Sequence, residues 1–343
     1  MTERRASRAT IVDVAKLAGV SPSTVSRVIT GKPRISARTS RRVIEVMEEL
    51  GYYPNMNARN LVAKQSNAIG LVIRSVENTF LNPFFPEVIR GISVAAQQEG
   101  FSIFMGMGRD AEEEKACAVK MVQGRQVDGV VLLHSRANDP LLPYLKQMQF
   151  PFVVVGRPKE KQTTYVDNDN VEGAAEATDY LIRKGHTSIA FLGGSMEYIV
   201  TVDRLDGYRK ALAAAGLPFR EEFVLEADFA EAGGSDAVRR LLSSGERPTA
   251  LLVMDDVMAV GVLGALRELG LRVPEDVSVV SFNNVPLSRF CSPPLTTVDI
   301  GIYELGFLAA SQLIERIRHP ERPSTQTLVH TRIVERHSVR AWK

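Results

Sequence analysis

Apolar residues within the first 50 positions recur in three short stretches at the spacing of one helix face. Their members are Ile11, Val14, Ala15 and Ala18, then Val25, Val28 and Ile29, and then Val43, Ile44, Met47 and Leu50. Thr10 and Ser21 precede the first two stretches as N-caps, and Gly19, Gly31 and Gly51 stand where helices should stop. This pattern predicts three helices, the third running from about residue 38 to residue 50.

Two short helices joined by a Gly-containing turn and braced by a third predict a helix-turn-helix. Hydroxyl side chains and Arg27 lie on the outward face of the second helix, and further hydroxyls and arginines lie near the start of the third. Such groups suit contacts with base edges and phosphates. They are Ser23, Thr24, Ser26, Arg27, Thr30, Ser36, Arg38, Thr39, Arg41 and Arg42. A three-helix protein-interaction module would show the same pattern and remains an alternative.

From residue 68 onward, short apolar runs alternate with amphipathic stretches. Strands are expected at residues 69–73, 102–105, 129–133, 152–155, 189–192, 250–254 and 277–282. Helices are expected at residues 86–99, 112–122, 170–184, 204–215, 235–242, 256–269 and 303–319. This alternation predicts an α/β fold with parallel sheets covered on both faces, in enough elements for two lobes.

Composition narrows the class of protein. The chain has 343 residues, 45% of them hydrophobic, and only two cysteines, which suits a reducing cytoplasm. Residues 1–8 are polar, unlike a signal peptide, and no apolar run approaches the roughly 20 residues that span a bilayer. Residues 1–64 carry 12 Lys and Arg against five Asp and Glu, whereas the remainder carries 30 against 35. We expect a soluble, cytoplasmic protein whose basic head meets a polyanion, although a solvated basic tail would share that charge.

Polar residues directly after the apolar runs are candidates for a ligand site, because ligands of such sheets lie beyond the carboxyl ends of the strands. Carboxylate, amide and guanidinium groups make the paired hydrogen bonds that sugar hydroxyls need, and phenylalanines can add an apolar wall. The candidates are His134, Ser135, Asp255, Asp256, Asn283 and Asn284, with Phe80, Phe84 and Phe85 as the wall. Arg204, which opens a predicted helix, is a further candidate. Each polar residue could instead cap a helix.

Three competing functions are weaker. Residues 106–111 fit the G-x-G-x-x-A pattern of a dinucleotide site, but Glu112, Glu113 and Glu114 would repel a pyrophosphate at that helix start. Asp255 and Asp256 could form an acid–base or metal pair, yet neighbours at a helix start point in different directions. The histidines show no metal-ligand spacing. A secreted sugar-binding protein would need an export signal and no headpiece. We therefore expect no enzyme, no metal and no cofactor.

The stretch from Thr10 to Ile29, with Ser36-Ala-Arg-Thr and Leu50-Gly-Tyr-Tyr-Pro-Asn, resembles the headpiece of the lactose-repressor/galactose-repressor family. The resemblance covers essentially the whole chain. It implies a helix-turn-helix headpiece at residues 1–53 and a two-lobed body, like periplasmic sugar-binding proteins, at residues 66–343. It also implies DNA contacts from Thr10, Ser21, Pro22, Ser23, Thr24, Ser26, Arg27, Ser36 and Thr39. Pro22 departs from the larger residues common at that base-reading position.

A short polar segment, residues 54–65, links the two parts. A helix this short is unstable alone in water, so a flexible linker is one interpretation. The family resemblance implies instead a hinge helix that forms on DNA and pairs with its dimer mate in the minor groove. Asn55 and Ala58 would then contact DNA, and Leu61 would wedge between central base pairs.

The resemblance implies that the first lobe covers residues of about 66–160 and 295–330, and the second about 161–294. The family's effector contacts match Arg204, Asp255 and Asn283, and more loosely Phe84 and His134. Four motifs are similar to the maltose-operon regulators of that family, so maltose or a maltodextrin is the expected effector. They are Gly156-Arg-Pro, Val166-Asp-Asn-Asp-Asn, Ser281-Phe-Asn-Asn and Tyr303-Glu-Leu-Gly.

We expect a homodimer, or a tetramer built from it, that binds a pseudo-palindromic double-stranded operator. Sugar binding that closes the lobes would change the dimer geometry and the order of the hinge. Repression released by the sugar is the default sign that the resemblance implies. A corepressor or an activator role is also compatible with the residues.

Overall fold

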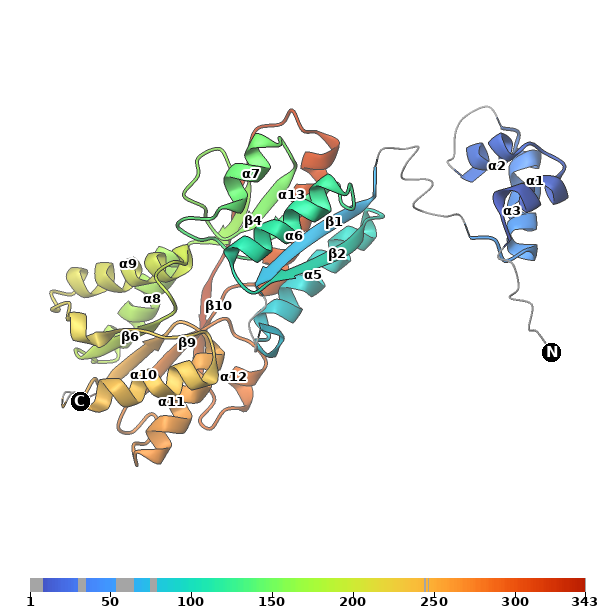
Figure 1. Ribbon diagram of the computed structural model, residues 1–343. Helices are drawn as coiled ribbons and strands as arrows, with labels where there is room; N and C mark the ends of the chain where they lie inside the picture. The colour runs from blue at the N-terminus through green and yellow to red at the C-terminus, as the bar shows by residue number, and fades with distance from the viewer. Residues whose placement is uncertain are drawn as a thin grey trace. The chain divides into compact units, whose positions relative to one another are not determined.

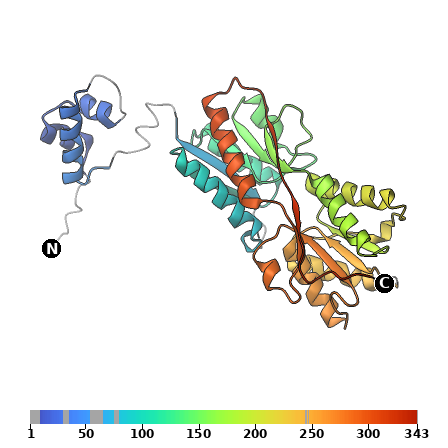
Figure 2. The same ribbon diagram turned by 180° about the vertical axis from the view of Figure 1, so that it is seen from behind.

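The computed structural model describes residues 9–29, 35–53, 65–74, 79–243, 245 and 247–342. The chain forms two compact units, residues 1–66 and 67–343, which we call the headpiece and the body. Figures 1 and 2 show the body from opposite sides, with its two lobes. The first lobe is built on the sheet that contains the first strand of the chain, and the second lobe is built on the other sheet.

The headpiece contains the three predicted helices, α1 (Ile11–Ala18), α2 (Pro22–Ile29) and α3 (Ala37–Glu49). Thr10 and Asp13 form a capping box at the start of α1, and Gly19 ends the helix with a left-handed φ of 70°. The core consists of Val14, Ala15, Val25, Val43 and Val46. Ile44, expected on the apolar stripe of α3, is 50% exposed, since Val46 lies one turn beyond Val43 and takes the buried place. The predicted stop at Gly31 lies outside the described residues.

The body holds two six-stranded sheets, as the alternating pattern predicts. The first has the order β11 (Gln326–Val329), β5 (Tyr165–Asn168), β4 (Phe152–Val155), β3 (Gly129–Leu132), β1 (Ala68–Arg74) and β2 (Ser102–Gly108). The second has the order β12 (Arg332–Val334), β10 (Thr296–Asp299), β9 (Ser278–Phe282), β8 (Ala250–Val253), β6 (Ile189–Gly193) and β7 (Val224–Glu226). All pairs are parallel except β10 with β12.

Helices cover both faces of each sheet. The first lobe has α5 (Phe84–Gln98) and α13 (Ile302–Arg318) on one face, with α6 (Ala111–Gln123) and α7 (Leu141–Gln147) on the other. Ile69, Leu71 and Ile73 pack with α5 and α13, whereas Ala68 and Val72 pack with α6 and α7. Because a strand alternates its side chains between faces, this double burial explains why β1 is apolar throughout.

The second lobe repeats this arrangement. Helices α8 (Asn170–Arg183) and α9 (Ile199–Ala214) cover one face, and α10 (Glu231–Ser243) and α11 (Asp256–Glu268) cover the other. Three short elements complete the body: η1 (Thr79–Leu81) precedes α5, η2 (Glu221–Phe223) precedes β7, and α12 (Leu287–Phe290) follows β9.

The first two passages of the chain between the lobes lie further along the sequence than expected. Residues 165–168 form β5, which pairs with β4 and β11 in the first sheet, so the passage expected near residue 160 follows β5 instead. The return expected from residue 295 follows β10, because residues 296–299 pair with β9 in the second sheet. A third passage, after residue 329, takes β12 back to the second sheet. As expected, the last helix, α13, joins the first lobe, where it packs on α5.

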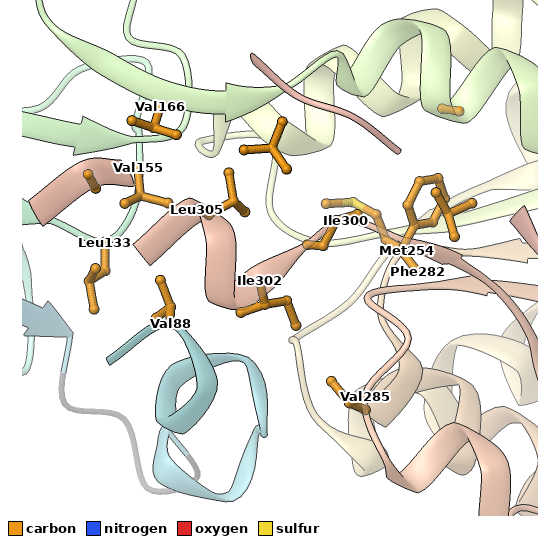
Figure 3. Close-up of a cluster of buried hydrophobic side chains, with 14 of the residues drawn as sticks. Val88, Leu133, Val155, Val166, Met254, Phe282, Val285, Ile300, Ile302 and Leu305 are labelled. Atoms are coloured by element: carbon orange, nitrogen blue, oxygen red, sulfur yellow. The ribbon is translucent and has the colours of Figure 1, made fainter. Parts of the chain in front are cut away.

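One group of buried apolar side chains continues from the first lobe into the second (Figure 3). Leu133 and Val155 belong to the first lobe, Met254 and Phe282 to the second, and Ile300 lies between them just after β10. Met254 and Phe282 directly precede Asp255 and Asn283 in the chain. Asp255 and Asn283, two candidate ligand contacts, therefore directly follow core residues in the region where the chain passes between the lobes.

Candidate DNA-binding and effector sites

The start of α2 presents a compact group of hydroxyls. Ser21 caps the helix, since its Oγ accepts a hydrogen bond of 3.2 Å from the backbone N–H of Thr24. Its Oγ also lies 2.8 Å from the Oγ of Ser23 and 2.9 Å from Oγ1 of Thr24. Pro22 and Ser23 are exposed, as is Arg27 one turn further on, while Thr24 and Ser26 are half-buried. Val25, fully buried, anchors the opposite face of the helix and so turns these polar groups outward.

Two further helix starts in the headpiece carry predicted DNA contacts. Ser36 caps α3 by accepting a 3.1 Å hydrogen bond from the N–H of Thr39, and the first turn of α3 has no acidic residue, which suits a phosphate. Thr10 differs, because its hydroxyl donates to the carboxylate of Asp13 over 2.7 Å. That bond lowers the pKa of Asp13 and keeps a negative charge at the start of α1. The predicted hinge contacts Asn55, Ala58 and Leu61 lie outside the described residues.

The body brings Arg204, Asp255 and Asn283 together at the carboxyl ends of β8 and β9. Arg204, on α9, is 4% exposed. Its Nε donates to Oδ1 of Asn170 over 2.9 Å and its Nη1 to the backbone oxygen of Met254 over 2.7 Å. Its guanidinium carbon lies 4.0 Å from the ring centroid of Phe282. Burial lowers the pKa of Arg204 to about 10, opposed by nearby carboxylates, so the side chain stays charged at neutral pH.

Asp255 is the centre of this group. Its Oδ1 caps α11 by accepting hydrogen bonds from the N–H of Val257 at 2.7 Å and of Met258 at 3.3 Å. Its Oδ2 accepts from the amides of Asn283 at 2.7 Å and Asn82 at 3.1 Å. Burial raises the pKa of Asp255, although these hydrogen bonds act in the opposite direction. Asp255 is therefore a helix cap and, at the same time, a polar group aimed at two side chains from different parts of the chain.

Asn82 is a site residue that the sequence reasoning missed. It lies between η1 and α5 in the first lobe, and its Oδ1 accepts a 3.0 Å hydrogen bond from the N–H of Phe84. Its bond to Asp255 joins the two lobes at the site. The available signal was the Asn82-Pro83 dipeptide, a turn signal directly before a predicted helix.

Residues of the Val166-Asp-Asn-Asp-Asn motif form hydrogen bonds that hold the Arg204 side chain in place. The amide of Asn170 donates to Oδ1 of Asp167 over 2.9 Å, and Oδ2 of Asp167 accepts from the N–H of Arg157 over 2.9 Å. Burial raises the pKa of Asp167 to about 6, against the effect of its backbone hydrogen bonds. Arg157 also pairs with Asp203 on α9, next to Arg204. This chain of contacts fixes the guanidinium of Arg204 in a single orientation.

The two effector contacts that match the family more loosely, Phe84 and His134, lie in different surroundings. Phe84 is half-buried and meets Phe85 edge to face, with 5.4 Å between ring centroids, as an apolar wall would require. His134 belongs to another group: its Nε2 lies 3.3 Å from Glu114, and its ring centroid lies 6.2 Å from that of Tyr198. Burial alone would raise the pKa of Glu114, but the hydrogen bonds from His134 and Arg136 outweigh it and lower the pKa. His134 contacts this ion-paired cluster rather than Arg204, Asp255 or Asn283.

The alternatives to a ligand-binding regulator find little support in the geometry. Asp255 and Asp256 contact different partners, Asp256 facing Ser281, Thr297 and the N–H of Val285. Within the described residues, no group of three or more His, Cys, Asp or Glu side chains is placed to hold a metal ion. None of the described helices has both the length and the apolar character that crossing a membrane requires.

Together, these features define a class: a helix-turn-helix headpiece on a two-lobed body whose polar residues converge where the lobes meet. Comparison with known proteins supports each part. Residues 10–55 match the model for bacterial regulatory proteins of the lacI family. Residues 178–339 match the model for a periplasmic binding protein-like domain. The chain belongs to the lacI family.

Relatives and solved structures agree over nearly the whole chain. It is 40% identical over 313 residues to the transcriptional regulator MalR of Streptococcus pneumoniae, covering 90% of this chain and 92% of that one. A complex of the regulator CelR with cellobiose matches with 35% identity and a TM-score of 0.76, over 96% of this chain and 100% of that one. The lac repressor dimer bound to operator and an anti-inducer matches with 28% identity and a TM-score of 0.87, over 97% and 99%.

Membership of this family confirms the α/β fold with a helix-turn-helix headpiece and a periplasmic-binding-protein-like body. The protein is a DNA-binding transcriptional regulator, and it is not an enzyme. The dinucleotide-binding alternative is thereby excluded. The match over residues 10–55 likewise excludes an export protein that has the body alone.

Proposed function

We propose that the protein is a homodimeric repressor of a maltose or maltodextrin utilisation operon, released from its operator when the sugar binds between the lobes. The observation that carries this proposal is the convergence of Arg204, Asp255 and Asn283 at one site, in a chain 40% identical to a regulator named MalR. The CelR complex supports a disaccharide as ligand, because cellobiose is the sugar in that related structure.

The chemistry of the site suits a neutral sugar. Asp255 and Asn283 offer acceptors and donors, and Arg204 offers a fixed cationic donor beside an aromatic ring. Sugar hydroxyls donate and accept at once, so such paired groups bind them with a defined geometry. The amides of Asn82 and Asn283 now donate to Oδ2 of Asp255, and a sugar hydroxyl would replace one of these bonds. Since Asn82 belongs to the first lobe, that exchange would alter how the lobes are joined.

Calorimetric titration of the whole protein with maltose, maltotriose and cellobiose tests the sugar assignment. Maltose and cellobiose differ only in the configuration of the bond between two glucose units. A site built on fixed hydrogen-bonding groups leaves those groups unpaired with the wrong isomer, so we expect maltose to bind more tightly by about tenfold or more. The assignment would be contradicted if cellobiose bound more tightly than maltose, or if neither maltose nor maltotriose bound.

Arg27→Ala is expected to weaken operator binding by about tenfold and to leave maltose affinity unchanged. An arginine on the recognition helix contributes roughly 1–3 kcal/mol when it contacts a base, or one unit of salt dependence when it contacts a phosphate. Fluorescence anisotropy with a labelled operator fragment at several salt concentrations measures both effects. Arg239→Ala, an exposed arginine in the second lobe, is the matched control. Equal operator affinities for the two variants would show that α2 does not contact DNA through Arg27.

The homodimer is proposed to form along one side of the body. Strand β2, an edge strand, exposes Phe104, Met105 and Met107 by 40–45%, and Phe290 on α12 is 82% exposed. Both elements lie on the same side of the body in Figures 1 and 2. Apolar surface on an open sheet edge is costly unless a partner covers it. A dimer that uses both lobes would also sense a change in the angle between them.

Phe290→Glu is expected to weaken the dimer by about tenfold or more, since a carboxylate would be buried in an apolar contact. Phe290 is mostly solvent-exposed in the monomer, so its replacement should not unfold the chain. Analytical ultracentrifugation over a concentration series measures the dissociation constant. Leu328→Glu, which changes a 57% exposed residue on the opposite edge strand β11, is the control. If Phe290→Glu remains as dimeric as the control, the interface lies elsewhere.

A further inference from the structure

Asp256 is a buried carboxylate directly beside the proposed sugar contact Asp255, yet it faces away from the site. Its side chain is fully buried. It accepts hydrogen bonds from the hydroxyl of Ser281, from Oγ1 of Thr297 at 2.8 Å and from the N–H of Val285 at 2.8 Å. These donors come from β9, from β10 and from the loop after β9. One carboxylate thus ties three segments of the second lobe to the start of α11.

The segment that Asp256 holds contains Asn283 and has an unusual backbone. Asn283 has a φ of 103° and Asn284 a φ of 53°, conformations that non-glycine residues rarely adopt. Such residues persist only where their surroundings hold them in place. Ser281 and Val285 flank them on both sides, and the N–H of Asn284 donates to Oγ1 of Thr297 over 3.3 Å. The contacts of Asp256 and Thr297 therefore fix the backbone from which the Asn283 amide reaches Asp255.

We propose that Asp256 is a positioning residue for the effector site: it holds the 283–285 loop and joins it to β10, the strand that leads back to the first lobe. The proposal rests on the proposed role of Asp255 and Asn283 as sugar contacts. Loss of Asp256 weakens sugar binding because the Asn283 amide is no longer presented to Asp255. Operator binding without sugar stays intact, because all of these contacts lie within the body.

The charge of Asp256 supports a functional rather than a stabilising role. Burial raises its pKa to about 7, the hydroxyl hydrogen bonds lower it, and the neighbouring Asp255 raises it further. A carboxylate whose pKa is higher in the folded than in the unfolded chain destabilises the fold increasingly as the pH rises from about 4 to 7. Asparagine removes that cost but places an amide N–H₂ against a donor. The gain from removing the buried charge and the loss from the misplaced amide oppose each other, so the melting temperature of Asp256→Asn should differ little from that of the wild type.

The test compares Asp256→Asn, Thr297→Val and the double variant in the whole protein, with Asp206→Asn as control. Asp206 is an exposed carboxylate on α9 of the same lobe. Replacing one of the two acceptor oxygens by an N–H₂ group is expected to weaken maltose binding about tenfold in Asp256→Asn. Thr297→Val should weaken it less, and the double variant should be no weaker than Asp256→Asn, since both changes break one network. Operator affinity without sugar should stay within about twofold of the wild type in all four.

Amide hydrogen exchange supplies a readout that needs no sugar. Exchange of the Val285 amide is expected to be at least about tenfold faster in Asp256→Ala than in Asp206→Ala, because alanine offers that amide no side-chain acceptor. If the wild-type protein fails to bind maltose, the sugar assignment fails, and this exchange rate alone decides the positioning role. Wild-type maltose affinity in Asp256→Asn, or a Val285 amide that exchanges no faster than in the control, would overturn the proposal.

Discussion

Asp255→Ala is expected to abolish the response to sugar while leaving operator binding intact. The change removes the carboxylate that accepts from both Asn82 and Asn283, and it leaves their buried amides without that partner. Hydrogen bonds to a charged group contribute roughly 1.5–3 kcal/mol each, so losing the bond from a sugar hydroxyl to Asp255 should weaken maltose binding by about 10- to 100-fold. Loss of the cap of α11 adds a stability cost of about 1 kcal/mol, which is too small to unfold a domain of this size.

Titration calorimetry with maltose and anisotropy with a labelled operator measure the two sides of this prediction. Asp236→Ala, which removes an exposed carboxylate from α10 of the same lobe, serves as the control. The sugar site is misplaced if Asp255→Ala binds maltose as the control does. A folded Asp255→Ala protein that no longer binds operator would instead contradict the division of labour between headpiece and body.

Gly306→Ala is expected to destabilise the first lobe strongly. Helices α5 and α13 pack backbone against backbone: a Cβ on Gly306 would lie 2.1 Å from the carbonyl oxygen of Val88. Gly91 is placed reciprocally, since its Cβ would lie 2.1 Å from the carbonyl oxygen of Tyr303. Two helix backbones cannot yield as a side chain can, so the helices must separate. Overpacking of this kind costs about 3 kcal/mol, more than the roughly 1 kcal/mol that alanine gains in helix propensity.

Gly264→Ala is the matched control, because a Cβ there meets no atom within 4 Å although the residue also lies in a helix. Chemical unfolding should place Gly264→Ala at or slightly above the wild-type stability, since only the helix-propensity gain remains. Gly306→Ala should unfold at clearly lower denaturant concentration. Equal stabilities for the two variants would mean that α5 and α13 are not packed as closely as described.

Apolar periodicity predicted the main elements of the fold, but it missed strands that contain buried polar side chains. Strand β5 was not expected, because two of its four residues, Asp167 and Asn168, are polar. Strand β10 begins with Thr296 and Thr297, whose buried hydroxyls are bonded to other segments. These polar positions are stabilised by tertiary partners, which local pattern does not contain. Both strands lie at passages between the lobes, which is why the lobe boundaries were misplaced.

The candidate site was predictable from local sequence where residues follow a buried run or stand near the start of a predicted helix. Asp255 and Asn283 directly follow apolar strands, so the rule for parallel sheets placed them correctly at one sheet edge. Asn82 and Asn170 reach the site from distant segments, and their partners lie 173 and 34 residues away in the sequence. Helix α9 starts at Ile199 rather than near Arg204, because it buries residues on several sides and shows no single stripe. Partners so far apart become visible only in the folded chain.

Sugar binding to the body is proposed to control DNA binding by the headpiece. The most direct test measures the affinity of the whole protein for a fragment of its gene's upstream region, at fixed salt, with and without maltose. We predict specific binding, stronger than to a scrambled fragment, that maltose weakens. Binding that maltose strengthens would mean that the sugar is a corepressor and would reverse the proposed sign. No specific binding at any salt concentration would contradict the proposed function.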